Sequence, residues 1–568
     1  MVVNRNMFRV VVSTIFLITG VYAASGQNLP VGTPILEDFY RREQLLGKFD
    51  STVTFSVRPL TSNVINRRNI FLPGGEASRA HLIDKEEGLD VQILPFQWKH
   101  QINSTIPYGW NDGAMIPSAG YQMMLSGGVY AKYKFLSIQL RPEYVLAQNK
   151  RYEGFNAKSR QAWSAWYSRW GNTIDKPERF GEGWYSKALL GQSSIRLTFD
   201  PVSVGLSTEN LWWGPGLYNS LMLSNTAPGF AHLTLNTTKP VKTPIGNFEG
   251  QIIAGRLDGS GFPPKEMGNS DHYEGFYRPK SDDWRYLSGI ILTYQPTWLP
   301  GLSIGLSRSF VAYSAALSGG LKNYLPFFEP AVKSSYGGEG DSAANEGEGI
   351  DRDQLLSTFV RWLIPSANAE AYFEYGRNDH PWNSRDLFVM LEHSRAYIFG
   401  FRKMTALNWF GDDYLNVNLE VMQSEGPTED IRRGGPWYRH GQVRHGYTHL
   451  GQMLGAGIDP GSNLQTLNIS WIQAMKQLGV QFQRYVHYND FFYLISDDMR
   501  RNWVDISMAL YGEWDYKNFL LSSQLHFIKA MNYQYQEVKP NPNANSYWSF
   551  SGNDKFNVQF QLGLYYKF

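Results

Sequence analysis

The segment 209–216 places two adjacent indole rings beside a carboxylate and an amide. Its sequence is Glu-Asn-Leu-Trp-Trp-Gly-Pro-Gly. Indole faces stack on the C–H faces of sugar rings, and the side chains of Glu209 and Asn210 can hydrogen-bond hydroxyl groups. Alternatively, Gly-Pro-Gly makes a tight bend and Trp212 and Trp213 pack against the rest of the protein. We favour packing, and we keep all four side chains as candidate ligand contacts.

The stretch 425–463 combines basic, aromatic and imidazole side chains. Arginine pairs with carboxylates through two parallel hydrogen bonds and aromatic rings stack on sugars, so this composition suits an acidic polysaccharide. A loop that folds inward as a constriction explains the composition equally well. The candidate ligand contacts in this stretch are Trp437, Tyr438, Arg439, Tyr447 and His449, and further basic residues nearby are Arg432, Arg433 and Arg444.

Two features invite a metal interpretation that the sequence does not support. His440, His445 and His449 have spacings of five and four, but no helix or strand register fixes them on one face. The acidic, glycine-rich stretch 337–350 lacks the ordered ligand spacing of an EF-hand loop, and we interpret it as a flexible surface loop. We therefore expect no metal and no cofactor.

Glu370 and Glu374 are the paired carboxylates that most resemble a catalytic arrangement, because glycoside hydrolases use two such groups. In a strand, however, residues four apart are separated by about 13 Å through the rise alone. We expect these carboxylates to pair with Arg361 or Arg377 instead. Serine and histidine residues are present, but no motif places a nucleophile beside a base. The sequence therefore predicts a protein that is not an enzyme.

The composition excludes several classes of protein. The 568 residues contain no cysteine, which removes disulfides and thiolate chemistry. The net charge of +2 gives no footprint for nucleic acid. Charged residues are only 18% of the chain while aromatic residues reach 15%, a balance that is unusual for a soluble enzyme. The mean hydropathy of −0.37 argues against a helical membrane protein.

The first residues have the order of a secretory signal peptide. A basic leader with Arg5 and Arg9 precedes the mostly apolar stretch 10–21, and Ala-Ser-Gly at 24–26 supplies small residues for cleavage. We predict a signal peptide over residues 1–26. No later stretch approaches the roughly 18 apolar residues that a transmembrane helix needs. The protein is therefore expected to be exported without a helical anchor.

Residues 27–87 are predicted to form an N-terminal periplasmic or plug segment that contains one helix. The helix is expected from Pro34 to Leu46, because Thr33 can cap its start, proline suits its first position, and Gly47 can end it.

The final segment shows the clearest strand pattern. From Phe556 to Phe568 an apolar residue occupies every second position, and the alternate positions are mostly polar. This period of two puts the two kinds of side chain on opposite faces of a strand. In a transmembrane barrel the apolar face meets lipid and the polar face meets the lumen. A terminal phenylalanine is also common in barrels handled by the barrel-assembly machinery, which favours the barrel over a soluble sandwich.

The same alternation recurs along residues 88–568, with connections that alternate in length. Short turns are expected near 200, 366 and 476–477, whereas long connections include 148–189 and 425–463. Short turns on one side and long loops on the other are typical of outer-membrane barrels. The sequence therefore predicts an all-β protein: a large antiparallel transmembrane barrel of about 16–18 strands over residues 88–568.

Several motifs, in order along the chain, resemble the capsule assembly Wzi family of outer-membrane proteins. The most distinctive is 205–216, Gly-Leu-Ser-Thr-Glu-Asn-Leu-Trp-Trp-Gly-Pro-Gly. It is preceded by Gly-Gln-Ser-Ser-Ile-Arg-Leu at 191–197 and followed by Glu-Ala-Tyr-Phe-Glu-Tyr-Gly-Arg-Asn-Asp at 370–379. Gly-Tyr-Thr-His-Leu-Gly-Gln at 446–452 comes next. The resemblance covers roughly residues 88–568.

The resemblance implies a monomeric barrel in the outer membrane of a Gram-negative bacterium, with a helical N-terminal portion on the periplasmic side. It implies a lectin-like protein that binds capsular polysaccharide or exopolysaccharide and aids capsule assembly and attachment, without catalysis or cofactor. Its expected partners are surface polysaccharide, outer-membrane lipid and, during biogenesis, the barrel-assembly machinery. A porin-like solute channel is the alternative, and an outer-membrane hydrolase is the third hypothesis.

Overall fold

The computed structural model describes twelve stretches of the chain. The predicted signal peptide, Arg432, Arg433 and the stretch 337–350 lie outside them. The described residues are 27–65, 81–86, 88–157, 159–264, 275–317, 320–328, 352–378, 384–389, 391–426, 437–496, 499–535 and 553–568.

The described strands form one closed antiparallel barrel with 18 strand positions around its wall. This confirms the expected fold and the expected number of about 16–18 strands. The barrel closes where the last strand pairs with the first long one, with Gln561 opposite Gln101. Three of these positions are each occupied by two short strands that follow one another in line: β7 with β8, β9 with β10, and β13 with β14.

The first half of the barrel, in chain order, consists of β5 (Leu89–Asn103), β6 (Gly120–Tyr133), β7 (Leu136–Leu140), β8 (Glu143–Ala147), β9 (Tyr185–Leu189), β10 (Ser194–Phe199), β11 (Val202–Ser207), β13 (His232–Thr237), β14 (Val241–Thr243), β15 (Gly246–Leu257), β16 (Arg285–Pro296) and β17 (Leu302–Tyr313). The second half consists of β18 (Arg352–Ile364), β19 (Ala369–Asn378), β20 (Arg395–Ala406), β21 (Asp413–Gln423), β24 (Asn463–Gln473), β25 (Lys476–Val486), β26 (Val504–Tyr516), β27 (Phe519–Met531) and β28 (Lys555–Tyr566). A short extra strand, β4 (His81–Glu86), pairs with β5.

The wall has an apolar outer face and a polar inner face. Along β28, Phe556 and Phe560 are exposed on the outside, whereas Asn557 and Gln559 are buried on the inside. This is the alternation predicted from the sequence. No helix among the described residues has the length and apolar character needed to cross a membrane. The exposed apolar belt therefore lies on the strands, as in outer-membrane barrels.

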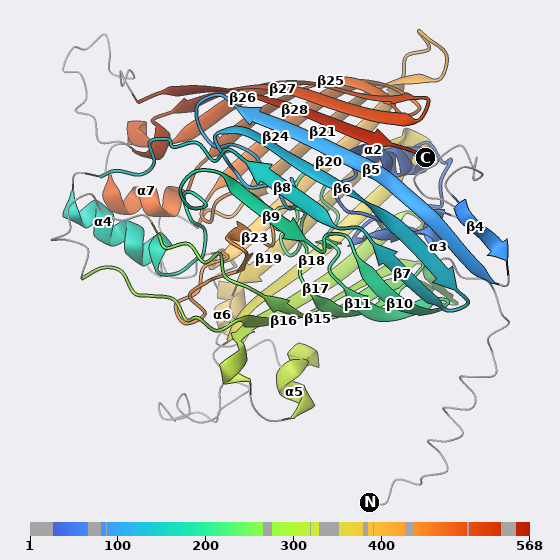
Figure 1. Ribbon diagram of the computed structural model, residues 1–568, viewed down its shortest axis with the longest axis horizontal. Helices are drawn as coiled ribbons and strands as arrows, with labels where there is room; N and C mark the ends of the chain where they lie inside the picture. The colour runs from blue at the N-terminus through green and yellow to red at the C-terminus, as the bar shows by residue number, and fades with distance from the viewer. Residues whose placement is uncertain are drawn as a thin grey trace, which may run out of the picture.

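The two ends of the barrel differ in the length of their connections (Figure 1). At one end lie short turns such as 200–201 and 365–368, together with the C-terminus. The turn expected at Lys476–Gln477 is wrong by two residues: it lies at 474–475, where Ala474 adopts a positive φ of 52°. Long connections lie at the opposite end. Because short turns are periplasmic and long loops extracellular in this class, we refer to the inner and outer ends.

The long connections carry short helices, and the lumen holds further small elements. The helices are α4 (Arg160–Trp166), which continues as a π-helical turn (Tyr167–Gly171), α5 (Leu321–Tyr324), α6 (Ser384–Val389) and α7 (Asn489–Ile495). The small elements are β1 (Asn28–Leu29), α2 (Pro34–Leu45), β2 (Val57–Arg58), β3 (Leu60–Thr61), α3 (Ser62–Ile65), β12 (Trp212–Trp213), β22 (Thr448–His449) and β23 (Gln452–Met453).

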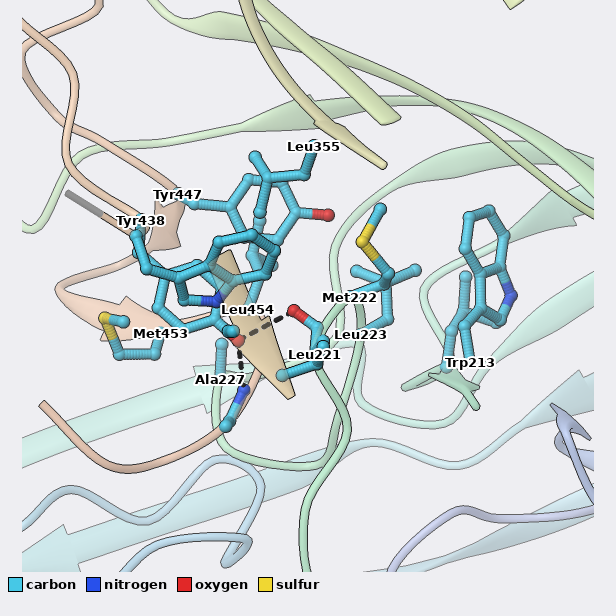
Figure 2. Packing of buried hydrophobic residues seen from close by; sticks show 14 of the residues in the cluster. Trp213, Leu221, Met222, Leu223, Ala227, Leu355, Tyr438, Tyr447, Met453 and Leu454 are labelled. Carbon is cyan, nitrogen blue, oxygen red and sulfur yellow. Dashed lines mark hydrogen bonds between the residues drawn. The ribbon is translucent and has the colours of Figure 1, made fainter. Parts of the chain in front are cut away.

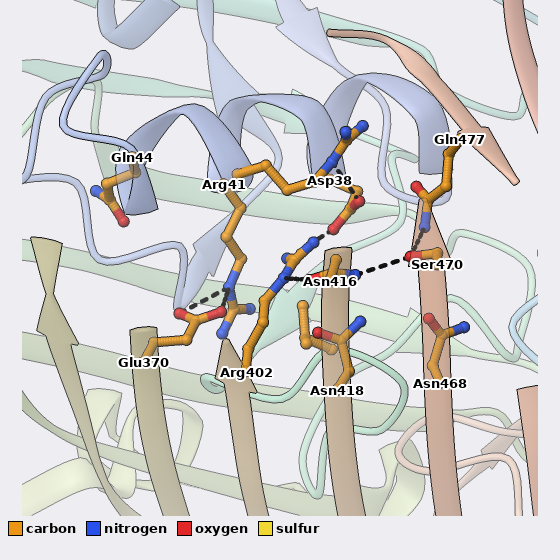
Figure 3. Close-up of polar contacts among 12 residues, drawn as sticks. Asp38, Arg41, Gln44, Glu370, Arg402, Asn416, Asn418, Asn468, Ser470 and Gln477 are labelled. Atoms are coloured by element: carbon orange, nitrogen blue, oxygen red, sulfur yellow. Dashed lines mark hydrogen bonds and ion pairs between the residues drawn. The ribbon is translucent and has the colours of Figure 1, made fainter. Parts of the chain in front are cut away.

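Helix α2 lies at the inner end of the lumen and is tied to the wall by buried charges (Figure 3). It begins at Pro34 as expected and ends one residue early, at Leu45. Thr33 does not cap it through its side chain, because the hydroxyl donates to the Pro30 carbonyl instead. Arg41 Nε lies 2.9 Å from Glu370 Oε1 on β19, and Arg402 on β20 lies 2.8 Å from Asp38.

A large apolar core fills the lumen between the two ends (Figure 2). We call it the plug core. Two loops that are far apart in sequence, 208–231 and 437–462, fold inward and bury their apolar side chains against inward-facing residues of the wall. Trp213 packs over Gly289 and Trp437 over Gly376, where a Cβ atom would come within 2.8 and 2.6 Å of the indole. Glycine at these strand positions therefore makes room for the rings.

Candidate functional site

The predicted contacts Glu209 and Asn210 are fully engaged with other protein groups. Glu209 is completely buried, pairs with Arg196 at 2.7 Å, and accepts a hydrogen bond of 2.8 Å from Asn28. Asn210 donates to the Ala227 carbonyl and accepts from a glutamine. Both side chains hold the start of the inward loop against the wall and the N-terminal segment.

The two tryptophans of the motif have different surroundings. Trp213 is completely buried in the plug core and donates a hydrogen bond of 2.8 Å to Gln251 on β15. Trp212 is 4% exposed and its ring lies under the guanidinium of Arg58, 4.3 Å from the ring centroid. Its Nε1 atom is buried with no hydrogen-bond partner among the described residues. Of the nine predicted contacts, only Trp212 borders either of the two cavities described below.

Three predicted contacts from the stretch 425–463, Trp437, Tyr438 and Tyr447, also belong to the plug core. The rings of Tyr438 and Tyr447 stack with centroids 5.8 Å apart, and Trp437 packs beside them. Tyr438 Oη donates to the Leu221 carbonyl at 2.7 Å and accepts from the Ala456 amide at 2.8 Å, as the dashed lines in Figure 2 show. These contacts join the two inward loops to each other.

Three basic side chains of that stretch, Arg439, His445 and His449, are buried with separate partners. Arg439 donates to the Arg169 carbonyl at 2.6 Å and lies over the ring of Tyr488. His449 accepts from the Asp258 amide, whereas His445 bonds the hydroxyl of a tyrosine. Burial lowers the pKa of both imidazoles to about 3. No group of three or more histidine, aspartate or glutamate side chains among the described residues is arranged to hold a metal ion.

Glu370 and Glu374 take part in interior packing on β19. Glu370 pairs with Arg361, at 2.6 Å, as expected, and also with Arg41 of α2. Glu374 accepts a 2.7 Å hydrogen bond from Ser357, so its pairing with an arginine is wrong. The pairing prediction therefore holds for one of the two carboxylates.

An aromatic cavity of about 170 Å³, here called the outer cavity, lies among the long connections at the outer end. It is bordered by α4, α7 and the segments 106–110, 176–178 and 533–535. Its aromatic lining includes Trp110, Tyr152, Trp170, Tyr488, Trp503 and Tyr535.

A buried histidine between two carboxylates forms one side of the outer cavity. His487 Nε2 lies 2.8 Å from Asp505 and Nδ1 lies 3.2 Å from Asp459. The imidazole is stacked on Trp503 with centroids 3.6 Å apart. Lys176 forms a further ion pair with Asp459. Because these polar groups satisfy one another, the cavity offers mainly ring faces to a ligand.

The charges of this network reinforce one another. Burial alone would lower the pKa of His487, but the carboxylates of Asp505 and Asp459 outweigh burial and raise it. Burial alone would raise the pKa of Asp459, but Lys176 and His487 hold it below its usual range. The two carboxylates therefore shift the imidazole of His487 toward its charged form.

A second cavity of about 370 Å³, here called the inner cavity, lies deeper in the lumen. One side is the wall from β21 and β24 to β28, and the other consists of α2, Trp212 and the segment 108–112. Tyr108, Gly109 and Trp110 border both cavities. The inner cavity is lined mainly by amides and hydroxyls, in contrast to the aromatic outer cavity.

Sequence reasoning missed most residues of both cavities. Trp170 lies in the long connection 148–189 that the pattern identified, whereas Trp110 lies between β5 and β6, where no long connection was predicted. No motif marked either of them or Trp503. The available signal was the repeated occurrence of tryptophan in several separate long loops at the same end. The amides of the inner cavity give no local signal, because alternate polar residues are common to every strand of the wall.

The fold and the cavities together identify the class of protein to which this chain belongs. A closed barrel with an apolar outer belt, long loops at one end and a lumen filled by inward loops is an outer-membrane barrel. The family model described as capsule assembly protein Wzi matches residues 120–537. The chain therefore belongs to the Wzi capsule assembly family.

Solved structures agree with this assignment at the level of the fold. The chain is similar to Wzi of Escherichia coli, described as an outer-membrane protein involved in group 1 capsule assembly and a carbohydrate-binding β-barrel. The identity is 12%, the match covers 96% of this chain and 100% of that chain, and the TM-score is 0.57. OccAB1 of Acinetobacter baumannii has 9% identity, coverage of 86% and 98%, and a TM-score of 0.41. No curated protein matches the sequence.

Proposed function

We propose that this protein binds surface polysaccharide at the outer end of its barrel and thereby aids capsule assembly and attachment. Membership of the Wzi capsule assembly family supports this role, and the Escherichia coli relative is described as carbohydrate-binding. Binding proceeds without catalysis and without a cofactor. The acting species is a monomer whose outer belt contacts membrane lipid, and the barrel-assembly machinery inserts it through its C-terminal strand.

The outer cavity is the observation that carries this proposal. Ring faces at the extracellular end suit the C–H faces of sugar units. A single sugar unit bound in the outer cavity contributes modestly to the binding free energy. Successive units of one polymer engage many copies of the protein on a cell, so avidity holds the capsule.

Direct contact of the nine predicted residues with sugar stays a prediction. Eight of them border neither cavity, and among these eight Asn210 and Trp213 hydrogen-bond other parts of the protein. We therefore expect these eight to act by holding the loops that shape the outer cavity.

The alternative of a porin-like channel is disfavoured by the plug core. Two inward loops and the N-terminal segment occupy the lumen and pack against the wall. A planar bilayer containing the protein is expected to show little current. Steady, voltage-independent conductance steps would favour the channel instead.

Removing flat ring faces from the outer cavity tests the proposal. Trp170→Leu and Trp503→Leu keep apolar bulk but lose the stacking surface. Each is expected to weaken binding of purified capsular polysaccharide by about tenfold, which is ~1.4 kcal/mol. Surface plasmon resonance on the detergent-solubilised protein measures this change. Trp98→Leu is the matched control, because Trp98 is a tryptophan on the lipid-facing side.

The second measurement compares cell-bound and released polysaccharide in whole cells. Deleting the gene is expected to reduce cell-bound polysaccharide and to increase the released fraction. Unchanged cell-bound and released fractions, with equal affinity of all three leucine variants, would contradict the proposal.

A further inference from the structure

We propose that the inner cavity is a second carbohydrate subsite, which takes a neutral mono- or disaccharide unit from the polymer bound at the outer cavity. This inference rests on the proposed function and adds a ligand class and a location inside the lumen. Its volume of about 370 Å³ falls in the ordinary range of small-molecule sites.

The lining of the inner cavity has the chemistry that hydroxyl groups require. Amide side chains both donate and accept hydrogen bonds, as sugar hydroxyls do. In Figure 3, Asn418 and Asn468 lie on neighbouring wall strands beside α2. The amides that line the cavity include Asn418, Asn468, Gln477, Gln481, Gln524 and Gln559.

Seven polar atoms of this lining are buried without a hydrogen-bond partner among the described residues. They are Oε1 of Glu37, Nε of Arg58, Oη of Tyr108, Nε1 of Trp212, Oδ1 of Asn418, Oε2 of Glu513 and Nε2 of His526. Trp212 and Asn418 are each only 4% exposed. Leaving such atoms unpaired is unfavourable. This mixture of donors and acceptors calls for a ligand that both accepts and donates hydrogen bonds, which a polyhydroxylated ring does.

The charges around the cavity favour a neutral sugar over an acidic one. Arg41 is paired with Glu370, and Arg58 lies 3.7 Å from Glu37. The carboxylates of Asp112 and Glu513 form no ion pair with any residue that the structure describes. A uronic acid would bring its own carboxylate close to these two, whereas a neutral hydroxyl can donate to them.

The position of the inner cavity connects it with the outer one. Tyr108, Gly109 and Trp110 border both, so a chain end held at the outer cavity lies beside the inner cavity. Trp110 supplies an aromatic surface to both spaces.

The test uses the full-length protein in a detergent without a sugar headgroup, because maltoside or glucoside detergents would compete. Isothermal titration measures binding of glucose, galactose, mannose, N-acetylglucosamine, maltose, glucuronic acid and galacturonic acid. At least one neutral sugar is expected to bind. Trp212→Phe and Glu513→Gln are each expected to weaken that binding about five- to tenfold, because the first removes an N–H donor and the second replaces one carboxylate acceptor by an NH2 group, which does not accept.

Two controls keep the outcome clear. Trp98→Phe, on the lipid-facing side, is expected to bind like the wild-type protein. Trp212→Phe keeps an aromatic ring over Arg58 and loses an N–H that has no hydrogen-bond partner among the described residues, so its fold is expected to survive. The heat-dependent gel shift of the barrel reports this.

Three outcomes would overturn the inference. In the first, no neutral sugar binds the wild-type protein or a variant. In the second, the wild type and both inner-cavity variants bind neutral sugars with equal affinity. In the third, the wild type binds the uronic acids more tightly than the neutral sugars. In each case, binding of intact polysaccharide is measured on the same wild-type sample. If the polymer binds, only the inner subsite fails; if it does not, the proposed function fails.

Discussion

The plug core and the outer cavity are both rich in aromatic residues, yet they use them in opposite ways. In the plug core, Trp213 and Trp437 are at most 1% exposed and fill space against wall glycines. In the outer cavity, Trp170 and Trp503 are partly exposed and border an empty volume. The difference shows that Trp213 of the distinctive Trp-Trp motif builds the fold, whereas scattered tryptophans form the aromatic surface of the outer cavity.

The physical reason lies in the surroundings of each ring. A ring in a packed core contacts atoms on all sides, so its removal leaves a void that the neighbours cannot fill. A ring beside an existing cavity has fewer contacts to lose. Stability and recognition should therefore respond differently to the same kind of substitution in the two regions, and four predictions test this.

The largest effect is expected from Trp213→Ala in the plug core. Truncating a fully buried tryptophan costs ~3–5 kcal/mol, and it also leaves Gln251 without its donor. The inward loops should loosen, so that bilayer conductance and protease cleavage within 208–231 both increase. Trp298→Ala, at an exposed position in a short turn, is the control and should change neither. A closed, protease-resistant Trp213→Ala variant would refute the central role of the plug core.

Glu370→Gln should have an effect almost as large. The substitution leaves Arg41 and Arg361, each 2% exposed, without their shared carboxylate. Breaking a buried ion pair on one side costs about 3–5 kcal/mol. Helix α2 should detach from the wall, and trypsin should then cleave after Arg41 or Arg42. Asp412→Asn removes the surface ion pair between Lys48 and Asp412, in which the aspartate is 85% exposed. This control should leave α2 protected from trypsin.

Trp503→Leu sharpens the comparison because it separates stability from binding. We expect a loss of stability of about 1 kcal/mol or less, since leucine keeps part of the packing and the site is already hollow. Polysaccharide affinity should nevertheless fall about tenfold. Chemical unfolding of the same sample used for binding measures both quantities. A stability loss as large as that of Trp213→Ala would remove the distinction between the two regions.

The smallest effect is a dependence on pH through His487. Because the folded-state pKa lies above the ordinary value of 6.5, the stabilisation by Asp505 and Asp459 is complete below that value. It is lost as the pH rises through the folded-state pKa. Asp459, whose pKa is lowered, stays ionised throughout this window. The melting temperature should fall by a few degrees between about pH 6 and about pH 9.

His487→Gln is the control for the pH effect. Glutamine keeps hydrogen-bonding capacity but does not titrate, so its curve should be flatter than that of the wild type. Parallel curves for the two proteins would show that other groups cause the dependence.

Much of the fold was predictable from local pattern. The period of two along β28 and the alternation of short turns with long loops predicted the barrel, because lipid and lumen impose opposite polarity on successive residues. The start of α2 was also predictable, since proline suits a first helical turn. The turn at 474–475 was misplaced because Ala474 carries no turn signal and adopts its positive φ only in context.

The candidate site was much less predictable. The clusters at 209–213 and 437–449 attracted attention because tryptophan, arginine and histidine are adjacent there in the sequence. Adjacency along the chain says nothing about which side of a loop faces empty space. The outer cavity draws Trp110, Trp170 and Trp503 from three connections. His487 lies in the same connection as Trp503 and meets Asp459 from a fourth connection and Asp505 from β26.

The sequence by itself determined the class of protein, the membrane-facing surface of its strands and the end at which its long loops gather. These properties follow from composition and from the period of two, which each strand carries independently. The tertiary structure alone decided that the loops fold inward, that Trp213 of the Trp-Trp motif becomes core, and that two cavities of different chemistry share one wall. Such features arise from contacts between residues hundreds of positions apart, which no local pattern encodes.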